Sequence, residues 1–346
     1  MKKLLGRLPL FSVALIFIIS FCFSAVSALG GSESFVSAFK ETEVAGLKPL
    51  KDEGLWTLYT ADSSKEYTAS SSQAVAVSAS ESDAIGKIYE QFLSPYSAKL
   101  SYNGIYIKNS TGLDINIKDE LAQKLTLKIE DTNEPQVLIV HTHATESYMM
   151  EERGFYTADD KARNTDNTKN VVKVGDVLAE TLEAGGIKVI HDKTQHDYPE
   201  YTGSYNRANK TISEYLARYP SIKVVVDLHR DSIAMTGNDK AKPTVKIDGK
   251  KAAQVMLVVG SETKSVTDFP NWRENFHLAL RYQQTMEVMY PGFARTMTFC
   301  SNRYNMHLTT GSMLLEVGTD SNTLEEACYS AELAGKALVS LLNTLR

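Results

Sequence analysis

Apolar residues recur in two different rhythms along the second half of the chain. Short runs at 137–141 and 222–228 are almost wholly apolar and rich in branched side chains, as buried strands are. Between such runs, apolar residues recur every three or four positions, for instance between Val171 and Leu182, and this helical pattern stops at Gly185. The alternation predicts an α/β fold with a mainly parallel sheet flanked by helices.

The same two patterns continue to the C-terminus. They predict strands at 187–190, 255–259 and 313–317, and helices over 206–219, 272–289 and 324–345. We therefore expect residues 135–346 to form a single domain around one α/β sheet. A sheet of this kind places its ligand crevice at the carboxyl ends of its strands.

The N-terminal residues carry the signals of export. Lys2, Lys3 and Arg7 precede an uncharged, mostly apolar run over 9–29, which is long enough to cross a bilayer as a helix. The positive flank predicts that the rest of the chain lies outside the cytoplasm. Small residues at 25–28 leave a cleaved signal peptide open as the alternative. Because the run is longer than a usual signal core, we favour a membrane anchor in residues 1–30.

Two further segments separate this anchor from the predicted domain. Residues 31–83 largely lack apolar periodicity and are rich in Ser and Ala, which is typical of a flexible linker. Residues 84–134 regain some apolar patterning, with a short amphipathic helix predicted around 84–93 and alternating segments near 105–107 and 125–129. We interpret 84–134 as a small ordered prelude to the C-terminal domain.

Composition and charge narrow the class of protein. The chain has 346 residues and a formal net charge of −5, so it has no excess of basic residues for nucleic acid, and we expect no nucleic-acid partner. Its three cysteines include no CxxC pair, and we assign them no function. The sequence also lacks the GxSxG, phosphate-loop and HExxH motifs of other enzyme classes.

Three of the predicted strands end in side chains that bind metals or transfer protons. His143 follows the first strand, His229 ends the run VVVDLH, and Glu316 interrupts the apolar strand MLLEV. Glu146 follows His143 by three residues, so a turn after the strand can bring the imidazole and the carboxylate onto one ion. Two neutral imidazoles, one carboxylate and an open fourth position suit a catalytic zinc ion. The pattern predicts zinc bound by His143, Glu146 and His229.

Other residues around these positions leave alternatives open. His141 lies on the same side of its strand as His143 and is therefore a rival ligand or a neighbour. An aspartate beside His229 can hold the tautomer of that imidazole. Burial would raise the pKa of the Glu316 carboxyl, which suits a group that takes a proton from water and passes it to a leaving amine. A buried salt bridge between Glu316 and Arg230 is the alternative.

Longer motifs connect these residues to a known family. The segments VLIVHTHATESY, VVVDLHRDS and SMLLEVGTDSNTLEEA occur in this order between positions 137 and 327. With them the sequence is similar to the stage II sporulation protein P family of endospore-forming bacteria, whose catalytic domain resembles the zinc-dependent N-acetylmuramoyl-L-alanine amidases of the cell wall. The resemblance covers essentially the whole predicted C-terminal domain.

The resemblance implies a function and a cellular location. It implies a zinc-dependent peptidoglycan hydrolase that cleaves the amide bond between N-acetylmuramic acid and L-alanine, with stem-peptide endopeptidase activity also attributed to the family. The enzyme would act in forespore engulfment as a single-pass protein of the cell membrane, anchored by its N-terminal helix, with the catalytic domain at 135–346 outside the cytoplasm. Its implied partners are peptidoglycan and the stage II sporulation proteins D and M.

The family pattern also implies roles for individual residues. It places the first zinc histidine on His143, the last on His229 and the catalytic glutamate on Glu316. The third ligand departs from the wider amidase pattern, in which it would fall near Asp166. We favour Glu146 instead, because it is closer in sequence to His143 and is itself a glutamate. Asp166 would otherwise serve as a helix N-cap.

Arg230 completes the predicted active site. In an amidase it would stabilise the oxyanion or bind a stem-peptide carboxylate. Further candidate contacts for the glycan or the peptide are Tyr205, Arg207 and Arg273. The competing hypothesis is a non-catalytic, membrane-anchored module that binds the cell wall or recruits a partner, in which both His143 and His229 are structural.

Overall fold

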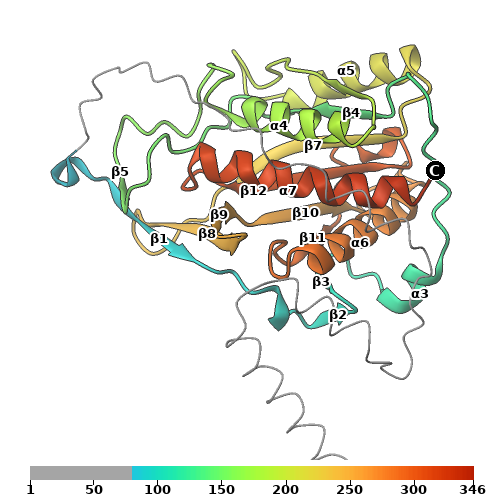
Figure 1. Cartoon of the computed structure of the whole chain (residues 1–346), viewed down its shortest axis with the longest axis horizontal. Helices are drawn as coiled ribbons and strands as arrows, with labels where there is room; N and C mark the ends of the chain where they lie inside the picture. The colour runs from blue at the N-terminus through green and yellow to red at the C-terminus, as the bar shows by residue number, and fades with distance from the viewer. Residues whose placement is uncertain (1–79) are drawn as a thin grey trace, which may run out of the picture. The chain divides into compact units, whose positions relative to one another are not determined.

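The computed structural model describes residues 80–346 of the chain. The predicted anchor at 1–30 and nearly all of the predicted linker at 31–83 lie outside the described residues. Within residues 80–346, no helix combines the length and the apolar composition that a membrane span requires. The described residues form two sheets with helices packed on them (Figure 1).

The larger sheet has eight strands in the order β2-β3-β11-β10-β12-β7-β4-β6. These strands are β2 (Leu100–Tyr102), β3 (Ile105–Asn109), β4 (Val137–Val140), β6 (Val189–His191), β7 (Val224–Asp231), β10 (Val255–Gly260), β11 (Met297–Cys300) and β12 (Ser312–Thr319). β3, β11 and β10 run parallel to one another, as do β12, β7, β4 and β6. β10 pairs with β12, and β2 with β3, in antiparallel fashion.

The prediction of an α/β fold is confirmed, but the sheet is mixed. A parallel neighbour needs a crossover connection, and α6 (Trp272–Met289) supplies one between β10 and β11. Between β11 and β12 the chain forms only a short 3₁₀ turn, η3 (Met306–Leu308), so β12 returns antiparallel beside β10. The reversal of direction therefore lies beside β12, one of the strands that carry the candidate site.

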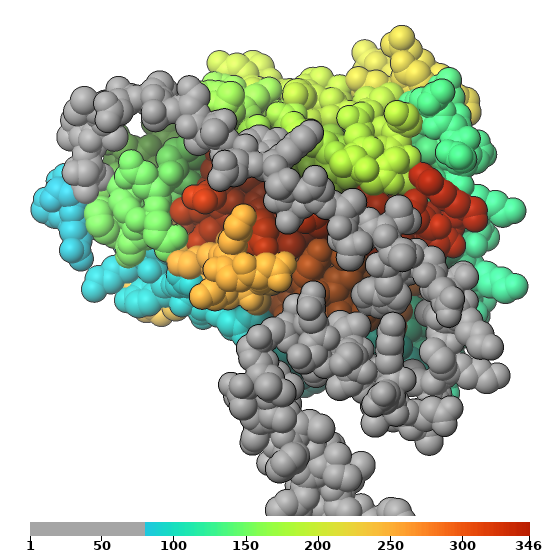
Figure 2. Space-filling model, in the orientation of Figure 1, coloured from blue at the N-terminus to red at the C-terminus, as the bar shows by residue number. Residues whose placement is uncertain are grey.

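Helices cover both faces of the larger sheet. α4 (Val171–Ala184), α6 and α7 (Leu324–Asn343) pack side by side over one face (Figure 1), and α5 (Ser204–Arg218) covers part of the other. On the face seen in Figure 2, the red residues of α7 lie between green and orange parts of the chain. The four helices predicted within residues 135–346 are thus all present, and α6 has the predicted bounds.

The surroundings of strand β4 explain why its residues do not alternate between apolar and polar. Val137 and Ile139 belong to the larger core on the α4 side of the sheet. Leu138 and Val140 point to the other face and pack with Ile212 of α5. Since both faces are covered, every position of the strand is buried, and the residues of the candidate site that follow Val140 are buried as well.

The structure also contains a smaller sheet, which was not predicted from the sequence. Its strand order is β5-β1-β8-β9. Its strands are β1 (Gly86–Gln91), β5 (Phe155–Tyr156), β8 (Lys240–Ile247) and β9 (Lys250–Ala253). The helix predicted around 84–93 is wrong, because β1 pairs with the distant strands β5 and β8, and such pairing overrides local spacing. β8 and β9 form a hairpin whose turn residues Asp248 and Gly249 have φ of 48° and 78°, as a tight two-residue turn requires.

Residues 84–134 contribute to both sheets. β1 lies in the smaller sheet, and β3 joins the larger one by pairing with β11. A short helix, α3 (Ile117–Ala122), is linked to α6 through a contact of 2.6 Å between Glu120 Oε2 and His277 Nε2. Of the two predicted alternating segments, 105–107 lies in β3, whereas 125–129 forms no strand, although Leu127 and Ile129 are buried.

Candidate active site

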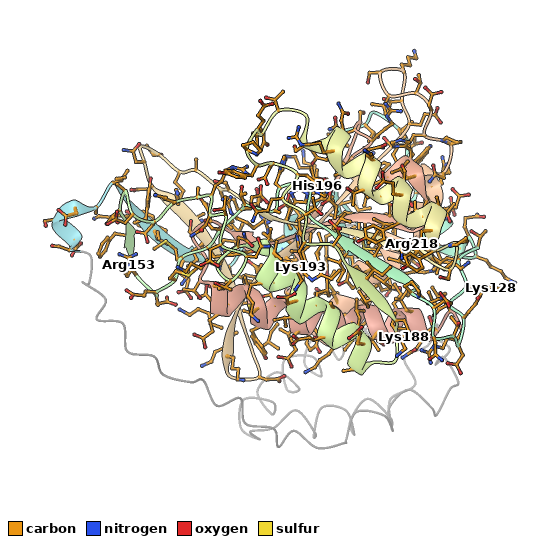
Figure 3. The ribbon with its side chains drawn as sticks, turned by 90° about the horizontal axis from the view of Figure 1, so that it is seen from above. Lys128, Arg153, Lys188, Lys193, His196 and Arg218 are labelled. Atoms are coloured by element: carbon orange, nitrogen blue, oxygen red, sulfur yellow. The ribbon has the colours of Figure 1, made fainter. Side chains whose placement is uncertain are left out.

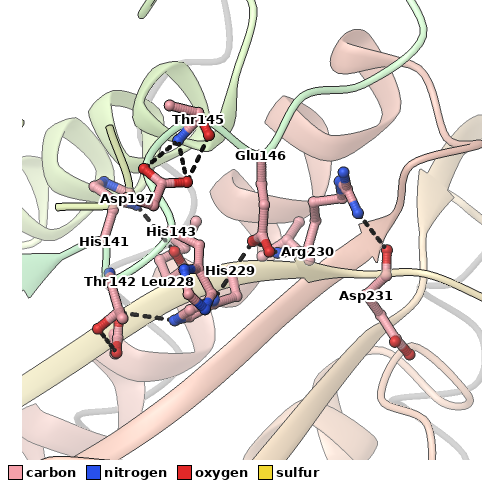
Figure 4. Close-up of polar contacts among 12 residues, drawn as sticks. His141, Thr142, His143, Thr145, Glu146, Asp197, Leu228, His229, Arg230 and Asp231 are labelled. Atoms are coloured by element: carbon pink, nitrogen blue, oxygen red, sulfur yellow. Dashed lines mark hydrogen bonds and ion pairs between the residues drawn. The ribbon is translucent and has the colours of Figure 1, made fainter. Parts of the chain in front are cut away.

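The candidate site lies at the edge of the larger sheet where the parallel strands β4, β7 and β12 end (Figure 4). His229 of β7 and Glu316 of β12 are direct partners in the register, so their side chains share one face of the sheet. Beyond β4 the chain turns, and the Glu146 amide donates to the His143 carbonyl at 3.1 Å. The fold therefore brings all four of these side chains to the same place.

Two carboxylates hold His229. Its Nε2 lies 3.0 Å from Asp227 Oδ1, and its Nδ1 lies 3.4 Å from Glu146 Oε2. Asp227 is itself fixed by Thr142, whose amide and hydroxyl donate to it at 2.8 and 2.6 Å. Burial opposes a charged imidazole, but Asp227 and then Glu146 raise the pKa of His229 well above its usual value. Asp227 thus lies at an ion-pair distance from Nε2 of this ring, without hydrogen-bond geometry, and Nδ1 faces Glu146.

His143 presents one free ring nitrogen to the same space. Its ring meets the ring of His229 edge to face, with centroids 5.2 Å apart. Nε2 of His143 lies 3.1 Å from the Tyr201 hydroxyl, whereas Nδ1 is buried and has no hydrogen-bond partner within residues 80–346. Burial, followed by the nearby His229, lowers the pKa of His143. The neutral imidazole, which is the metal-binding form, is therefore favoured.

The donor atoms of His143, Glu146 and His229 fit a zinc ion. In the described part of the chain, no three His, Cys, Asp or Glu side chains already have the spacing of a complete metal cluster. Imidazole nitrogens and a carboxylate oxygen are nevertheless the ligands that zinc takes in catalytic sites. The 3.4 Å between His229 Nδ1 and Glu146 Oε2 is also close to the separation of two ligands in a tetrahedron whose bonds are about 2.0–2.1 Å long.

Glu316 is a buried carboxyl group with an unusual pKa. Its Oε2 has no hydrogen-bond partner among residues 80–346. Burial raises the pKa of Glu316 to about 8; His229 opposes the rise, Glu146 and Asp231 add to it, and Arg295 opposes it. A carboxyl group with a pKa near neutrality can both accept and donate a proton at physiological pH. Glu316 therefore has the property expected of a general base and acid.

Arg230 connects the loops around the site. Its Nη1 donates to the Asp231 carbonyl at 3.2 Å (Figure 4), its Nε to the Ser147 carbonyl at 2.9 Å, and its Nη2 to the Ala162 carbonyl. Its backbone amide also donates to Glu146 Oε2 at 3.2 Å. The predicted oxyanion contact stays a prediction, because every guanidinium nitrogen already donates to a backbone carbonyl. These contacts favour a role in positioning Glu146.

Asp166, the alternative third ligand, is exposed and makes local contacts. Its Oδ1 accepts hydrogen bonds from the amide and the hydroxyl of Thr168 at 3.0 and 2.6 Å, and Oδ2 lies 3.5 Å from Lys169 Nζ. It is not the N-cap of α4, because the helix begins later and Asn170 caps it. The geometry favours Glu146 over Asp166 as the third donor.

His141, the rival histidine, uses both ring nitrogens inside the protein. It is fully buried, with Nδ1 2.9 Å from the Leu228 carbonyl and Nε2 2.8 Å from Nε2 of His191. Because a carbonyl only accepts, Nδ1 of His141 carries the proton, and Nε2 is occupied by its contact with His191. Gly175 of α4 leaves room for the pair, since a Cβ there would lie 2.7 Å from Nε2 of His141. His141 is a structural neighbour of the site.

Replacing His141 with glutamine is expected to reduce the loss of stability in mild acid. Burial lowers the pKa of His141 from 6.5 to about 3. Below pH 6.5 the unfolded chain therefore binds a proton that the folded protein does not. The free energy of unfolding then decreases by up to about 1.4 kcal/mol for each unit by which the pH is lowered. Urea unfolding in chelator, at about pH 7.5, 6.5 and 5.5, should give a shallower pH dependence for His141→Gln. Parallel pH profiles for the two proteins would contradict this assignment.

Three residues next to the site have no role in the prediction from the sequence. Tyr201 and Asp197 lie in the loop between β6 and α5, and Arg163 lies in the loop before α4. Tyr205, a predicted contact, does reach His143, edge to face with centroids 5.4 Å apart. The cluster of aromatic residues in HDYPEYTGSY is the signal that could have pointed to this loop.

Solved structures similar to this chain include N-acetylmuramoyl-L-alanine amidases of low identity. The CwlD amidase from Clostridioides difficile, in complex with the GerS lipoprotein, is 14% identical, with a TM-score of 0.35, over 61% of this chain and 98% of that chain. Ami1 from Mycobacterium smegmatis is 11% identical, with a TM-score of 0.36, over 62% of this chain and 99% of that one. Likenesses this distant carry no argument about the site.

The relationship to a protein family is closer. A relative from Bacillus subtilis (strain 168), the stage II sporulation protein P, is 33% identical over 224 residues, which are 62% of this chain and 52% of the relative. The chain thus spans about half the length of the curated relative that it matches. The family model of stage II sporulation protein P matches residues 59–339, which include every residue of the candidate site. The chain therefore belongs to the stage II sporulation protein P family.

Proposed function

We propose that this chain is a zinc-dependent peptidoglycan hydrolase of spore formation that cleaves the N-acetylmuramoyl-L-alanine amide bond. The observation that carries the proposal is the convergence of donor atoms from His143, Glu146 and His229 beside the buried carboxyl of Glu316. Three protein ligands and an open position, next to a group that transfers protons, are the parts of a hydrolytic zinc site. Membership of the family supports the cell-wall substrate.

The side chains of the site have separate tasks in this reaction. A bound zinc ion would polarise the amide carbonyl and make a water molecule more acidic. Asp227 holds Nε2 of His229, so that Nδ1 stays directed at Glu146. Glu316, with a pKa of about 8, takes a proton from the water and delivers it to the nitrogen of the leaving amine. The products are a muramoyl carboxylate and a peptide with a free amino terminus.

We extend the proposal to the cellular location and the partners of the enzyme. The family relationship supports an extracytoplasmic enzyme of forespore engulfment that works with the stage II sporulation proteins D and M. The apolar run at 9–29, preceded by three basic residues, supports attachment to the cell membrane as a single span. Stem-peptide endopeptidase activity is a further proposal for the same site, because a second amide bond needs the same chemistry.

The purified full-length protein is expected to contain about one zinc ion per chain, and His143→Ala to lose most of it, because one of three donors is gone. Elemental analysis measures the metal in both proteins under matched conditions. Release of new amino termini from purified peptidoglycan should stop in chelator and return with added zinc. Full activity in chelator would reject the zinc mechanism. A folded wild-type protein with neither zinc nor activity would favour the non-catalytic wall-binding module.

A further inference from the structure

The exposed side chain of Tyr201 covers the buried imidazole of His143. Tyr201 is 55% exposed, whereas His143 is 7% exposed. The two rings stack, with centroids 4.5 Å apart and an interplanar angle of 18°. The Tyr201 hydroxyl also lies 3.1 Å from Nε2 of His143. A side chain that is largely open to solvent is thus held by two contacts to one candidate metal ligand.

Arg163 also contacts the Tyr201 ring. The guanidinium carbon lies 4.6 Å from the centroid of the Tyr201 ring, within range of a cation–π contact. Nη1 of Arg163 donates to Asp197 Oδ2 at 2.5 Å and to the Thr145 hydroxyl at 3.1 Å. Buried Asp197 also accepts from the Thr145 amide at 3.2 Å. Both Arg163 and His143 therefore contact the Tyr201 ring, and Arg163 is anchored beside the turn that carries His143.

The loop that carries Tyr201 is itself fixed at its base by His196, which can be found in Figure 3. Nδ1 of His196 lies 3.0 Å from the His141 carbonyl, and Nε2 lies 2.9 Å from the Thr211 hydroxyl on α5. Arg207 of α5 donates to the carbonyls of His196 and Thr202 at 2.6 and 3.1 Å. The loop is thus tied both to the end of β4 and to α5, which sets the position of Tyr201.

The position of Tyr201 on His143 matches that of Asp227 on His229. Each partner lies against Nε2 of its imidazole, Tyr201 by a hydrogen bond and Asp227 at an ion-pair distance, so Nδ1 of His143 stays unpartnered among the described residues and Nδ1 of His229 faces Glu146. A metal-binding imidazole carries its proton on the other nitrogen, and an acceptor there fixes the tautomer and the orientation of the ring. A tyrosine oxygen can accept that hydrogen bond.

We propose that Tyr201, held by Arg163, is a positioning residue that fixes the ring and the tautomer of His143 for metal binding. This inference rests on the proposed zinc site. Asp227 acts on His229 from inside the sheet, whereas Tyr201 acts on His143 from the solvent side. Since Tyr201 is exposed, its replacement changes the site without opening a cavity in the core.

Tyr201→Phe tests the proposal, because it keeps the stacked ring and removes only the hydroxyl. We expect its zinc dissociation constant to rise about 10-fold, the lower end of the range for hydrogen-bond partners of metal-binding histidines. Competition with a chromophoric chelator measures this constant in the full-length protein. In the metal-free protein, NMR of the imidazole nitrogens should show more of the His143 tautomer that carries its proton on Nδ1. Tyr201→Ala, which also loses the stack, should bind zinc more weakly still.

Tyr205→Phe is the matched control. Tyr205 also touches the His143 ring, edge to face, but makes no hydrogen bond to it within the described residues. Its variant should keep the zinc affinity and the His143 tautomer of the wild type. Wild-type zinc affinity together with a wild-type tautomer in Tyr201→Phe would overturn the inference and leave the zinc site intact. A wild-type protein that binds no zinc would instead overturn the proposed function, and this inference with it.

Discussion

Glu316→Gln is expected to slow amide hydrolysis by about 100- to 10,000-fold, the usual contribution of a positioned general acid–base group. The amide of glutamine nearly matches the carboxyl group in shape but cannot exchange the proton. Glu316 lies beside His229 in the register, and its Oε2 has no hydrogen-bond partner within residues 80–346 that the substitution would break. Zinc content should equal that of the wild type, because Glu316 is not one of the three proposed donors.

Glu120→Gln is a matched control for this loss. Glu120 is also a buried glutamate, 8% exposed, but it lies on α3 and contacts Arg273 and His277 instead of the site. Release of amino termini from peptidoglycan, measured with protein shown to be folded by circular dichroism, should stay near the wild-type rate in Glu120→Gln. Full activity and normal zinc content in Glu316→Gln would mean that another group transfers the proton.

Elements that bury a continuous apolar surface could be predicted from the sequence. β4, β7 and β12 are apolar on both faces, and α6 and α7 present apolar positions at helical spacing, so their local patterns determine them. β8 could not be recognised in the same way, because Lys240, Lys242 and Lys246 occupy alternate positions. Lys240 and Lys242 pair with Asp320 and Glu326, which are distant in sequence, and no local pattern reveals these contacts.

As with the fold, only part of the candidate site could be predicted from the sequence. His143, His229 and Glu316 stand out because polar side chains that bind metals or transfer protons follow or interrupt buried strands. The contacts of Arg230 could not be foreseen, since its charge indicates an anion partner but its nitrogens donate to backbone carbonyls. Tyr201 could not be selected either, because only the folded loop brings its hydroxyl to an imidazole 58 positions earlier.

Lys242 of β8 is a buried cation that joins separate parts of the fold. Its side chain is 2% exposed, and Nζ lies 2.9 Å from Glu326 Oε1 and 2.7 Å from Glu152 Oε1. Glu326 is buried as well and forms the capping box of α7 with Thr323. One ammonium group thus links the smaller sheet to the helix that covers the larger one.

Lys242→Met is expected to lower the free energy of unfolding by about 3–5 kcal/mol, because it leaves the buried carboxylate of Glu326 without its cation. Lys251→Met is the control. Lys251 Nζ lies 2.7 Å from Glu90 Oε2 and 2.9 Å from Glu152 Oε1, but its side chain is 39% exposed. That variant should lose only about 0–1 kcal/mol. Denaturant unfolding of the three proteins measures both differences.

The comparison of Lys242 with Lys251 separates the effect of burying an ion pair on stability from the effect of its N–O distance. Both lysines lie at 2.7 and 2.9 Å from their two nearest carboxylate oxygens, so a difference of several kcal/mol between the variants must come from the desolvated charge that is left behind. Adding Glu326→Gln to Lys242→Met should then recover most of the loss, because an amide needs no counter-ion. Equal losses in the two single variants would show that burial does not decide what these pairs contribute to stability.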